Sequence, residues 1–273
     1  MIRSDIRADY GVDAPPVVRN LALCGLAGVV IAAVAHHVVL PLHPVAGAVI
    51  FGWTFYPGAS MLFSAFLMVL SSRIGKLRER ERLIDSLELL GDEIVLDVGC
   101  GRGLLLVGAA RHILGGRAIG VDLWQSRDQS GNSPSAVRSN AHAEATSERI
   151  DLTTADMRSL PFIDGSADLV LSSLAIHNIP DLSGRDEAIR EIARVLKPGG
   201  RLVLLDIAHT RDYTRLLESL GWIDVARTRL LFRMFPPFRI VTGRKPAAGE
   251  PKSPVDPADL AHTITTEETP ASV

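Results

Sequence analysis

Two long apolar stretches near the start of the chain dominate its hydrophobic pattern. Residues 21–40 and 45–70 contain no Asp, Glu, Lys or Arg. Each stretch is long enough to cross the hydrocarbon core of a bilayer as a helix, which takes about 20 residues. Neither stretch has the amphipathic spacing of a helix half buried in a soluble protein. With the connector Pro41-Leu42-His43-Pro44 between them, they predict a transmembrane helical hairpin over residues 21–70.

Two alternatives exist for these stretches. They could form a buried helical pair of a soluble protein, or Leu21–Val30 could be the core of a signal peptide with a cleavage site at Ala33-Val34-Ala35. The lack of amphipathic periodicity disfavours the first alternative. The second leaves residues 45–70 unexplained, so the hairpin is the preferred interpretation.

Basic residues lie at both ends of the predicted hairpin and are absent from its connector. They are Arg3, Arg7 and Arg19 before it, and Arg73, Lys76, Arg78, Arg80 and Arg82 after it. Lys and Arg accumulate on the cytoplasmic side of membrane proteins. We therefore expect a multi-pass protein of the cell membrane, with residues 1–20 and the rest of the chain after residue 70 in the cytoplasm.

Residues 71–90 carry mixed charges and predict a linker helix. One face of this helix would hold Ile74, Leu77, Ile84 and Leu87, and the arginines would lie on the other faces. Anionic lipid headgroups could bind this basic collar, or its charged face could simply be solvated.

Small residues in the hairpin allow its helices to approach each other closely. The candidates are Ala48 with Gly52 and Ser60 with Ser64. In the same stretch, Pro57-Gly58 indicates a kink in the second helix.

From residue 91 onward, short apolar runs alternate with helical patterns, which predicts an α/β domain over residues 91–245. Four helices would centre near residues 107, 140, 190 and 215. The predicted strands are Ile94–Val98, Ala118–Asp122, Ile150–Thr153, Asp168–Ser173, Arg201–Asp206, Ile223–Leu231 and Phe238–Thr242. Residues 246–273 lack periodicity and are rich in Pro, Ala, Thr and Glu, so they predict a disordered tail.

The first predicted strand runs into a glycine-rich turn with the pattern D-x-G-x-G-x-G. Asp97 is followed by Gly99, Gly101 and Gly103, and a helix continues from Leu104. A strand, a glycine loop and a helix N-terminus in this order hold nucleotide-like ligands in doubly wound α/β folds. A dinucleotide fingerprint, G-x-G-x-x-G, would need its third glycine at the position of Leu104.

This turn resembles motif I of the class I S-adenosylmethionine-dependent methyltransferases, and further landmarks of that family follow in order. They are the second acid at Asp122, residues 155–162, residues 168–173, and the Lys197-Pro198-Gly199-Gly200 turn within residues 194–202. The resemblance spans about residues 75–245. It implies a Rossmann-like, doubly wound, seven-stranded sheet that closes with an antiparallel hairpin.

The resemblance also implies a site for S-adenosylmethionine. Gly99, Cys100, Gly101, Gly103 and Asp97 would meet the amino-acid part, Asp122 the ribose and Asp156 the adenine. Leu123, Met157 and Ser173 complete the expected cofactor-binding set. Two of the carboxylates have structural alternatives, since Asp97 could cap the loop and Asp122 could cap a helix.

The polar segment after Asp122 departs from the usual family pattern. Ser133 can cap a helix whose first residue is Pro134. Trp124 could stack on adenine or could be a partly buried residue of a surface loop.

Methyl transfer mainly requires that two partners be aligned and water excluded, so a base is needed only for a protonated acceptor. His177 is the tentative catalytic residue, because it follows the fourth strand and titrates near neutral pH. Asn178 could orient a ligand. Asp206 and His209 are weaker candidates, and Tyr213 could equally pack in a helix.

Charge and composition limit the classes of molecule that could accept the methyl group. The net charge of −2 and the pI of about 6.4 do not favour nucleic acid, and no Asn/Asp-Pro-Pro-aromatic motif follows the fourth strand. The two cysteines, Cys24 and Cys100, imply neither a disulfide nor a metal site. The composition says nothing about oligomeric state.

The leading hypothesis is therefore a membrane-anchored, S-adenosylmethionine-dependent methyltransferase that acts on a small, lipophilic acceptor. The alternative is a catalytically silent membrane protein that binds S-adenosylmethionine or acts as a scaffold. An NAD-dependent oxidoreductase fits the acid at Asp122 but not the glycine spacing.

Overall fold

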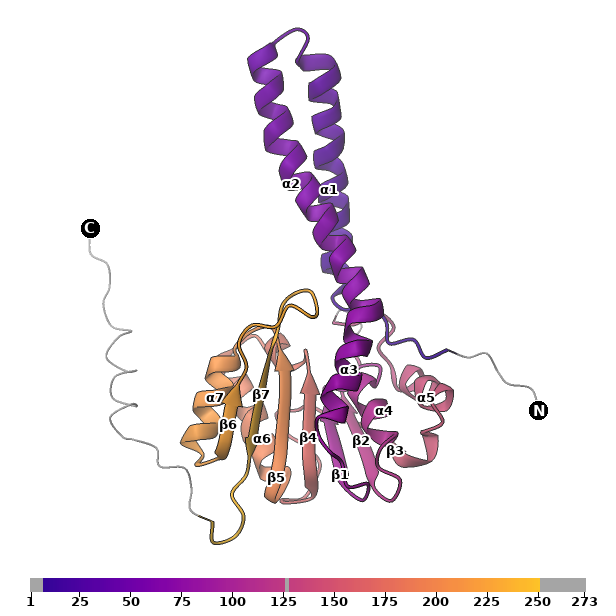
Figure 1. Cartoon of the computed structure of the whole chain (residues 1–273), viewed down its shortest axis with the longest axis vertical. Helices are drawn as coiled ribbons and strands as arrows, with labels where there is room; N and C mark the ends of the chain where they lie inside the picture. The colour runs from indigo at the N-terminus through magenta and orange to yellow at the C-terminus, as the bar shows by residue number, and fades with distance from the viewer. Residues whose placement is uncertain (1–6, 126–127, 251–273) are drawn as a thin grey trace, which may run out of the picture.

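A long helical hairpin projects from an α/β domain in the computed structural model, which describes residues 7–125 and 128–250 (Figure 1). Helix α1 (Pro15–Val34) continues through a π-helical turn at Ala35–Val39, and α2 (Pro44–Leu70) returns toward the domain. A second π-helical turn, Ser71–Gly75, joins α2 to α3 (Lys76–Asp85) without a break. The predicted boundary near residue 70 is therefore the point where one continuous helix enters the domain.

The two hairpin helices cross at glycines. A Cβ atom on Gly25 would lie 2.8 Å from the Gly58 carbonyl oxygen, and one on Gly28 would lie 2.9 Å from the Thr54 carbonyl oxygen. Only residues without a Cβ allow backbones to approach this closely. The proposed contact at Gly52 is wrong, because an added Cβ there would have nothing within 4 Å. Pro57 lies inside α2 and does not end it.

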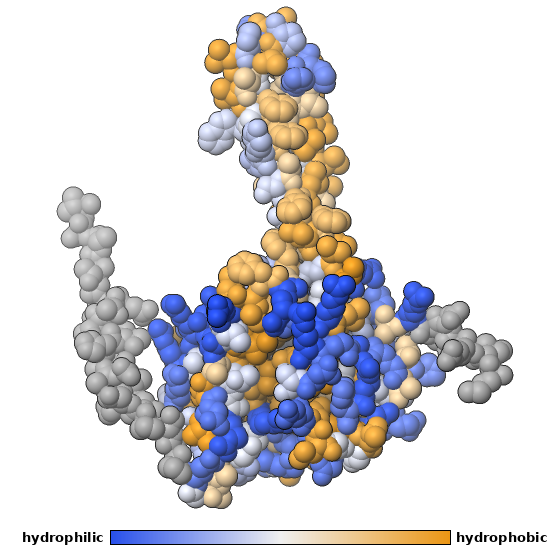
Figure 2. Space-filling view, in the orientation of Figure 1, coloured by the Kyte–Doolittle hydropathy of each residue, from blue (hydrophilic) through white to orange (hydrophobic). Residues whose placement is uncertain are grey.

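Apolar side chains form most of the hairpin surface seen in Figure 2, and hydrophilic ones lie near its tip. Two helical stretches, Pro15–Val39 and Pro44–Asp85, are long and apolar enough to span a membrane by length and composition. Only 11% and 22% of the residues in their most apolar windows are buried. The core helices of soluble proteins bury such residues instead. Apolar side chains exposed on the hairpin include Leu23, Val45, Trp53, Tyr56 and Phe63.

The domain contains a seven-stranded sheet in the order β3-β2-β1-β4-β5-β7-β6. Five strands are parallel, and β7 pairs antiparallel with both β5 and β6. The strands are β1 (Ile94–Val98), β2 (Arg117–Asp122), β3 (Ile150–Thr154), β4 (Ala167–Ser173), β5 (Leu196–Asp206), β6 (Ile223–Arg227) and β7 (Arg239–Arg244). The predicted Rossmann-like, seven-stranded fold with a closing antiparallel pair is confirmed.

Helices cover both faces of this sheet (Figure 1). They are α4 (Leu104–Ala110), α5 (Pro134–Ala143), α6 (Leu182–Val195) and α7 (Thr210–Ser219). Side chains of β1 alternate between the two faces, as the period of a strand requires. Leu96 packs in the core that α6 and α7 cover, whereas Val95 packs in the core formed with α3 and α4.

Two predicted elements differ from the structure. Strand β6 ends at Arg227 rather than Leu231, because the apolar residues that follow leave the sheet and reach the hairpin, where Met234 is buried. Strand β5 begins at Leu196 rather than Arg201, and it includes Gly199, whose φ of +80° suits a residue without a side chain.

The predicted linker helix is correct in type but shorter, since α3 ends at Asp85. Its proposed apolar face holds for Ile84 and Leu87, which are buried, but not for Ile74, which is exposed. The predicted basic collar is wrong for Lys76 and Arg80, because both are buried in ion pairs with Asp13 and Glu144.

Candidate cofactor and acceptor site

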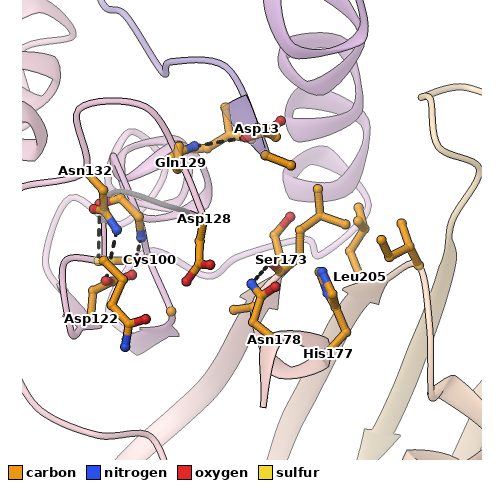
Figure 3. Close-up of a pocket in the computed structure, with 18 of the residues that line it drawn as sticks. Asp13, Cys100, Asp122, Asp128, Gln129, Asn132, Ser173, His177, Asn178 and Leu205 are labelled. Carbon is orange, nitrogen blue, oxygen red and sulfur yellow. Dashed lines mark hydrogen bonds between the residues drawn. The ribbon is translucent and has the colours of Figure 1, made fainter. Parts of the chain in front are cut away.

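One cavity of about 760 Å³ lies at the carboxyl ends of the parallel strands, where doubly wound folds bind ligands. Its volume is within the range of pockets that enclose whole small molecules, about 300–1,000 Å³. Figure 3 shows the end near the glycine loop together with the wall formed by His177 and Asn178. At the other end, Met68 of α2 and residues 234–236 complete the lining. The cavity therefore extends from the glycine loop to the base of the hairpin.

The glycine loop is packed so tightly that side chains would not fit. Gly99 has a φ of +73°, and a Cβ there would lie 2.3 Å from Ala175 Cβ. Gly101 has a φ of +53°, and its Cβ would lie 2.5 Å from Gln129 Oε1. Both glycines line the cavity, as does Cys100. Gly103 precedes α4 and packs against Val137, so its role in the structure is to begin the helix.

Asp97 is buried at the end of β1 and lines the cavity. Its Oδ2 accepts a hydrogen bond from the backbone N–H of Leu106, 2.9 Å away. One oxygen of Asp97 therefore has the capping role that was predicted from the sequence as the alternative to cofactor binding. Burial, reinforced by the charge of Asp122, raises the pKa of the Asp97 carboxyl to about 7. A cationic ammonium group bound nearby would favour the ionised form.

The raised pKa of Asp97 has a measurable consequence for stability. The folded pKa lies above the unfolded one, so its stabilising effect is present below about pH 4 and is lost as the pH rises to about 7. We expect Asp97→Asn to be on the order of 4 kcal/mol more stable than wild type above that range and similar to it at low pH. Thermal unfolding of the micelle-solubilised chain across pH measures this; a difference independent of pH would contradict it.

Asp122 ends β2 and organises the glycine loop. Its Oδ2 accepts from Gly101 N–H at 2.8 Å, and its Oδ1 accepts from Trp124 N–H at 2.6 Å and from Asn132 Nδ2 at 3.1 Å. A carboxylate has about four acceptor positions, so capacity for a further donor remains. Asp122 does not cap a helix, because the next helix, α5, is capped by Ser133 with Pro134 in its first turn, as predicted.

The side chain of Trp124 lies against the core beside β1 and β2, and its indole N–H donates to Thr154 Oγ1 at 2.8 Å. This contact favours the surface-loop alternative for Trp124 over stacking on adenine. Leu123, which is exposed, does line the cavity.

Asp156 and Met157 follow β3 and line the cavity across from Asp122. Hydrogen bonds from the Arg158 guanidinium, the shortest 2.6 Å long, hold the pKa of the Asp156 carboxyl below its usual range. Met157 lies close to Gly99, and Ser173, the last residue of β4, contributes to the same wall. Apart from Gly103, the cofactor-binding set expected from the sequence thus lines one cavity.

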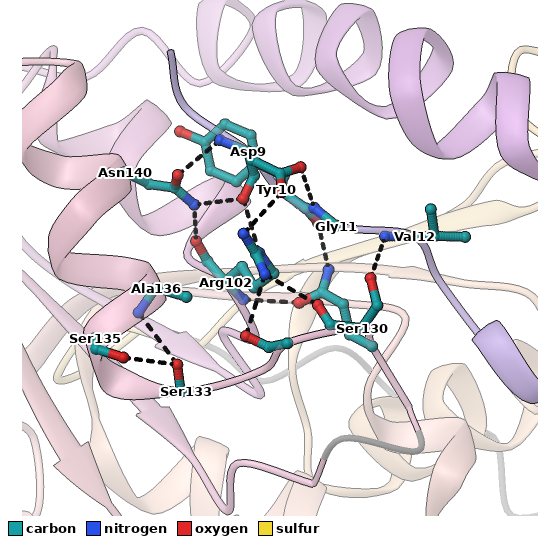
Figure 4. A network of polar contacts seen from close by, with 12 residues as sticks. Asp9, Tyr10, Gly11, Val12, Arg102, Ser130, Ser133, Ser135, Ala136 and Asn140 are labelled. Carbon is teal, nitrogen blue, oxygen red and sulfur yellow. Dashed lines mark hydrogen bonds and ion pairs between the residues drawn. The ribbon is translucent and has the colours of Figure 1, made fainter. Parts of the chain in front are cut away.

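A segment that the sequence did not reveal covers the glycine-loop end of this cavity. Residues 8–14, here called the strap, lie over the glycine loop and residues 128–132 (Figure 4). Tyr10 is buried, and the backbone of Asp9 exchanges two hydrogen bonds with the amide of Asn140. Gln129, within residues 128–132, connects the glycine loop to the strap, because its side chain accepts from Arg102 N–H and donates to Tyr10 O. A lone tyrosine in a polar segment is a weak sequence signal for such a role.

Arg102 holds the strap in place. Its guanidinium donates to Asp9 O at 2.7 Å and Asp9 Oδ2 at 3.0 Å, and also to the carbonyl oxygens of Ser130 and Gly131. We expect Arg102→Met to release the strap and weaken S-adenosylmethionine binding about tenfold, or about 1.4 kcal/mol. Isothermal titration calorimetry measures the effect, with Arg138→Met of the exposed face of α5 as control. Equal affinity for both variants would contradict a role of the strap in closing the site.

His177 faces the middle of the cavity from the turn after β4. Its Nδ1 lies 2.5 Å from Asp206 Oδ1, close enough for an ion pair although the ring N–H does not point along a hydrogen-bond direction. Asp206 is buried at the end of β5 and also accepts from His177 N–H and Tyr213 O–H. Burial and this carboxylate raise the pKa of the Tyr213 phenol. Asp206 and Tyr213 therefore position His177, and His209 lies at the start of α7 beside Asp212.

Comparison with known proteins agrees with this geometry. The family profile for the methyltransferase domain matches residues 96–204. The domain is a class I methyltransferase. The cofactor of this family is S-adenosylmethionine, and the residues from Asp97 to Ser173 that line the cavity fit it. The loop glycines leave room for the cofactor to approach the backbone closely, and Asp122 has a free acceptor position.

Curated relatives of this methyltransferase domain come from bacteria, an animal and a plant. GfsG, a methyltransferase of Streptomyces halstedii, is 35% identical over 155 residues, which cover 55% of this chain and 52% of that protein. A demethylmenaquinone methyltransferase of Lactobacillus johnsonii is 28% identical, covering 60% of each. A sterol 4-C-methyltransferase of Caenorhabditis elegans is 31% identical, covering 49% of this chain and 36% of that protein. The chain thus spans from about a third to three fifths of these relatives.

Solved structures share the fold of the methyltransferase domain. An S-adenosylmethionine-dependent methyltransferase from Aquifex aeolicus superposes with a TM-score of 0.50 at 16% identity, covering 66% of this chain and 97% of that one. A geranyl diphosphate methyltransferase in complex with S-adenosylmethionine gives 0.51 at 16% identity, covering 62% and 85%.

Proposed function

We propose that this protein is a membrane-anchored methyltransferase that transfers the methyl group of S-adenosylmethionine to a small, lipophilic acceptor. The observation that carries the proposal is the continuous cavity, which begins at the glycine loop and ends among Val17, Met68 and Phe235 at the base of the apolar hairpin. Relatives named for a sterol and for demethylmenaquinone support a small acceptor of this kind.

The cofactor supplies an electrophilic methyl group on a sulfonium, and the chain supplies alignment. We assign the amino-acid part of the cofactor to Asp97 and the glycine loop, the ribose to Asp122, and the adenine end to Asp156 with Leu123 and Met157. The strap and residues 128–132 exclude water from the cofactor end. An acceptor bound between His177 and the apolar wall of the cavity would be aligned with the methyl donor.

His177 is the residue assigned to the acceptor side. We expect His177→Ala to lower kcat about 100-fold for an acceptor that loses a proton, with the affinity for S-adenosylmethionine unchanged. Steady-state kinetics with a calorimetric titration separates the two effects. His209→Ala is the matched control, since His209 lies in a neighbouring turn beside Asp212. A loss of cofactor affinity in His177→Ala would assign this histidine to the cofactor instead.

The decisive experiment for the reaction uses the full chain in membranes. Methyl-labelled S-adenosylmethionine is incubated with the protein and a lipid extract, and mass analysis identifies the labelled product. The proposal expects label in an organic-soluble small molecule. Binding of S-adenosylmethionine without any labelled product would favour a silent binding protein.

The proposed topology is tested by cysteine accessibility. In a chain with His43→Cys, the connector between α1 and α2 should react with an impermeant maleimide only from the outer side of the membrane. Labelling from the cytoplasmic side would contradict the orientation, with both termini and the methyltransferase domain in the cytoplasm.

A further inference from the structure

The loop between β6 and β7, residues 228–238, lies outside the sheet and beside the base of the hairpin. In Figure 1 it rises along the continuous helix α2–α3 to the level where the hairpin leaves the domain. An isolated bridge between Leu231 and Phe238 closes the loop at its root. Its apex is therefore presented on the same side of the domain as the apolar hairpin.

Specific contacts fix the height of this loop relative to the hairpin. The backbone N–H of Phe235 donates to Ser71 Oγ at 2.8 Å, and Ser71 directly follows the uncharged stretch that ends at Leu70. Arg233 forms two hydrogen bonds with the buried carboxylate of Glu79, at 2.8 and 2.6 Å. Met234 is buried against the same helix turn, close to Gly75. The loop apex thus stands level with the end of the apolar part of α2.

The loop exposes an aromatic side chain that the fold does not use. Phe232 is 77% exposed, although Met234 and Phe238 of the same loop are buried. Ile74, one turn beyond the apolar stretch of α2, is also exposed, and Figure 2 shows an apolar surface over the loop apex. Two exposed arginines are close in sequence to these side chains: Arg229 lies three residues before Phe232, and Arg73 directly precedes Ile74. Arg73 also pairs with Asp9.

We propose that the 228–238 loop inserts Phe232 into the interfacial region of the bilayer, as a second membrane contact beside the hairpin. Aromatic side chains with adjacent arginines occupy this interface, where the ring enters the acyl boundary and the cations meet the headgroups. Because residues 234–236 also line the cavity, the loop holds the cavity's apolar end against the membrane surface. This inference rests on the proposed membrane anchoring of the hairpin.

The test uses an environment-sensitive nitrobenzoxadiazole fluorophore attached to single cysteines of the full chain in vesicles of phosphatidylcholine and phosphatidylglycerol. The parent carries Cys24→Ala; Cys100 stays, because burial raises the pKa of its thiol. The labelled variants are Phe232→Cys, Trp53→Cys in α2 and Ile163→Cys. Ile163 precedes β4, at the amino ends of the parallel strands, and is 80% exposed, so it matches Phe232 in exposure.

Lipids that carry a nitroxide at the headgroup end of the acyl chain should quench the label at position 232 about twofold, because an interfacial side chain reaches about 5–10 Å into the membrane. The label at position 163 should not be quenched. If Trp53→Cys is quenched by deep nitroxides but position 232 is not quenched by shallow ones, the loop proposal fails and the anchored hairpin stands. If neither is quenched, membrane anchoring itself fails. A blue shift at position 232 without quenching would assign the loop to a protein partner and overturn the proposal.

Discussion

Asp122→Ala is expected to weaken S-adenosylmethionine binding on the order of 100-fold, about 2.7 kcal/mol. Two effects combine in this variant. The carboxylate is the proposed acceptor for the ribose hydroxyls, and hydrogen bonds to a charged group contribute about 1.5–3 kcal/mol. The same carboxylate holds Gly101 and Trp124 through their backbone N–H groups, so its removal also loosens the glycine loop. Isothermal titration calorimetry on the solubilised full chain measures the change.

Three control variants separate these effects. Asp122→Asn keeps one accepting oxygen and should lose less affinity than Asp122→Ala. Asn132→Ala removes only a supporting donor to Asp122 Oδ1 and should change affinity by less than tenfold. Asp151→Ala alters an exposed aspartate on the neighbouring strand β3 and should have no effect. If Asp122→Ala binds as tightly as Asp151→Ala does, the ribose assignment is wrong.

Local sequence signals were sufficient to predict the sheet and the glycine turn at the centre of the proposed site. The turn after β1 needs positive φ angles that glycine adopts easily, so the spacing of the glycines alone predicted the turn at Gly99 and Gly101. The cap of α5 by Ser133 is likewise a short-range hydrogen bond between neighbours in sequence. Both features are determined within a few residues.

The features that sequence reasoning missed depend on contacts between distant segments. The strap bonds across more than 90 residues to Arg102 and more than 110 to Gln129, and no periodicity in residues 8–14 indicates this. The apolar run after β6 suggested a longer strand, because hydrophobicity alone does not distinguish a strand from a loop that packs on the hairpin. Lys76 and Arg80 looked like a solvated collar because their partners, Asp13 and Glu144, are far away in sequence.

These long-range contacts connect the hairpin to the proposed cofactor site. Lys76, on the helix that continues from α2, donates to Tyr10 O and Asp13 Oδ1 in the strap. Gln129 donates to the same two oxygens while it accepts from the glycine loop at Arg102 N–H. The position of the hairpin and the closure of the cofactor site therefore share one hydrogen-bond network. A shift of the helix at Lys76 would therefore reach the glycine loop through the two shared oxygens of the strap and the side chain of Gln129.

Glu79→Ala is expected to destabilise the chain most, because it leaves the charge of Arg233 without its partner at the junction of hairpin and domain. The Glu79 carboxylate is buried, and Arg233 donates to both of its oxygens. The Arg233 side chain is 41% exposed, so water solvates part of the charge left behind, and we expect a loss of about 1.5–3 kcal/mol. This corresponds to a fall in Tm on the order of 5 °C for a domain of this size. Thermal unfolding in micelles measures the shift, and trypsin should cleave faster after Arg233 once the loop is released.

Removal of both partners distinguishes the ion pair from simple packing at this junction. Glu79→Met combined with Arg233→Met replaces two charges by apolar side chains of similar length, so the double variant should recover most of the Tm that Glu79→Ala loses. Glu218→Ala, on the exposed face of α7, is the control and should leave the Tm unchanged. If the double variant were as unstable as Glu79→Ala, the junction would depend on the shape of Glu79 rather than on its charge, and the loop would be held by Met234 and Phe235 alone.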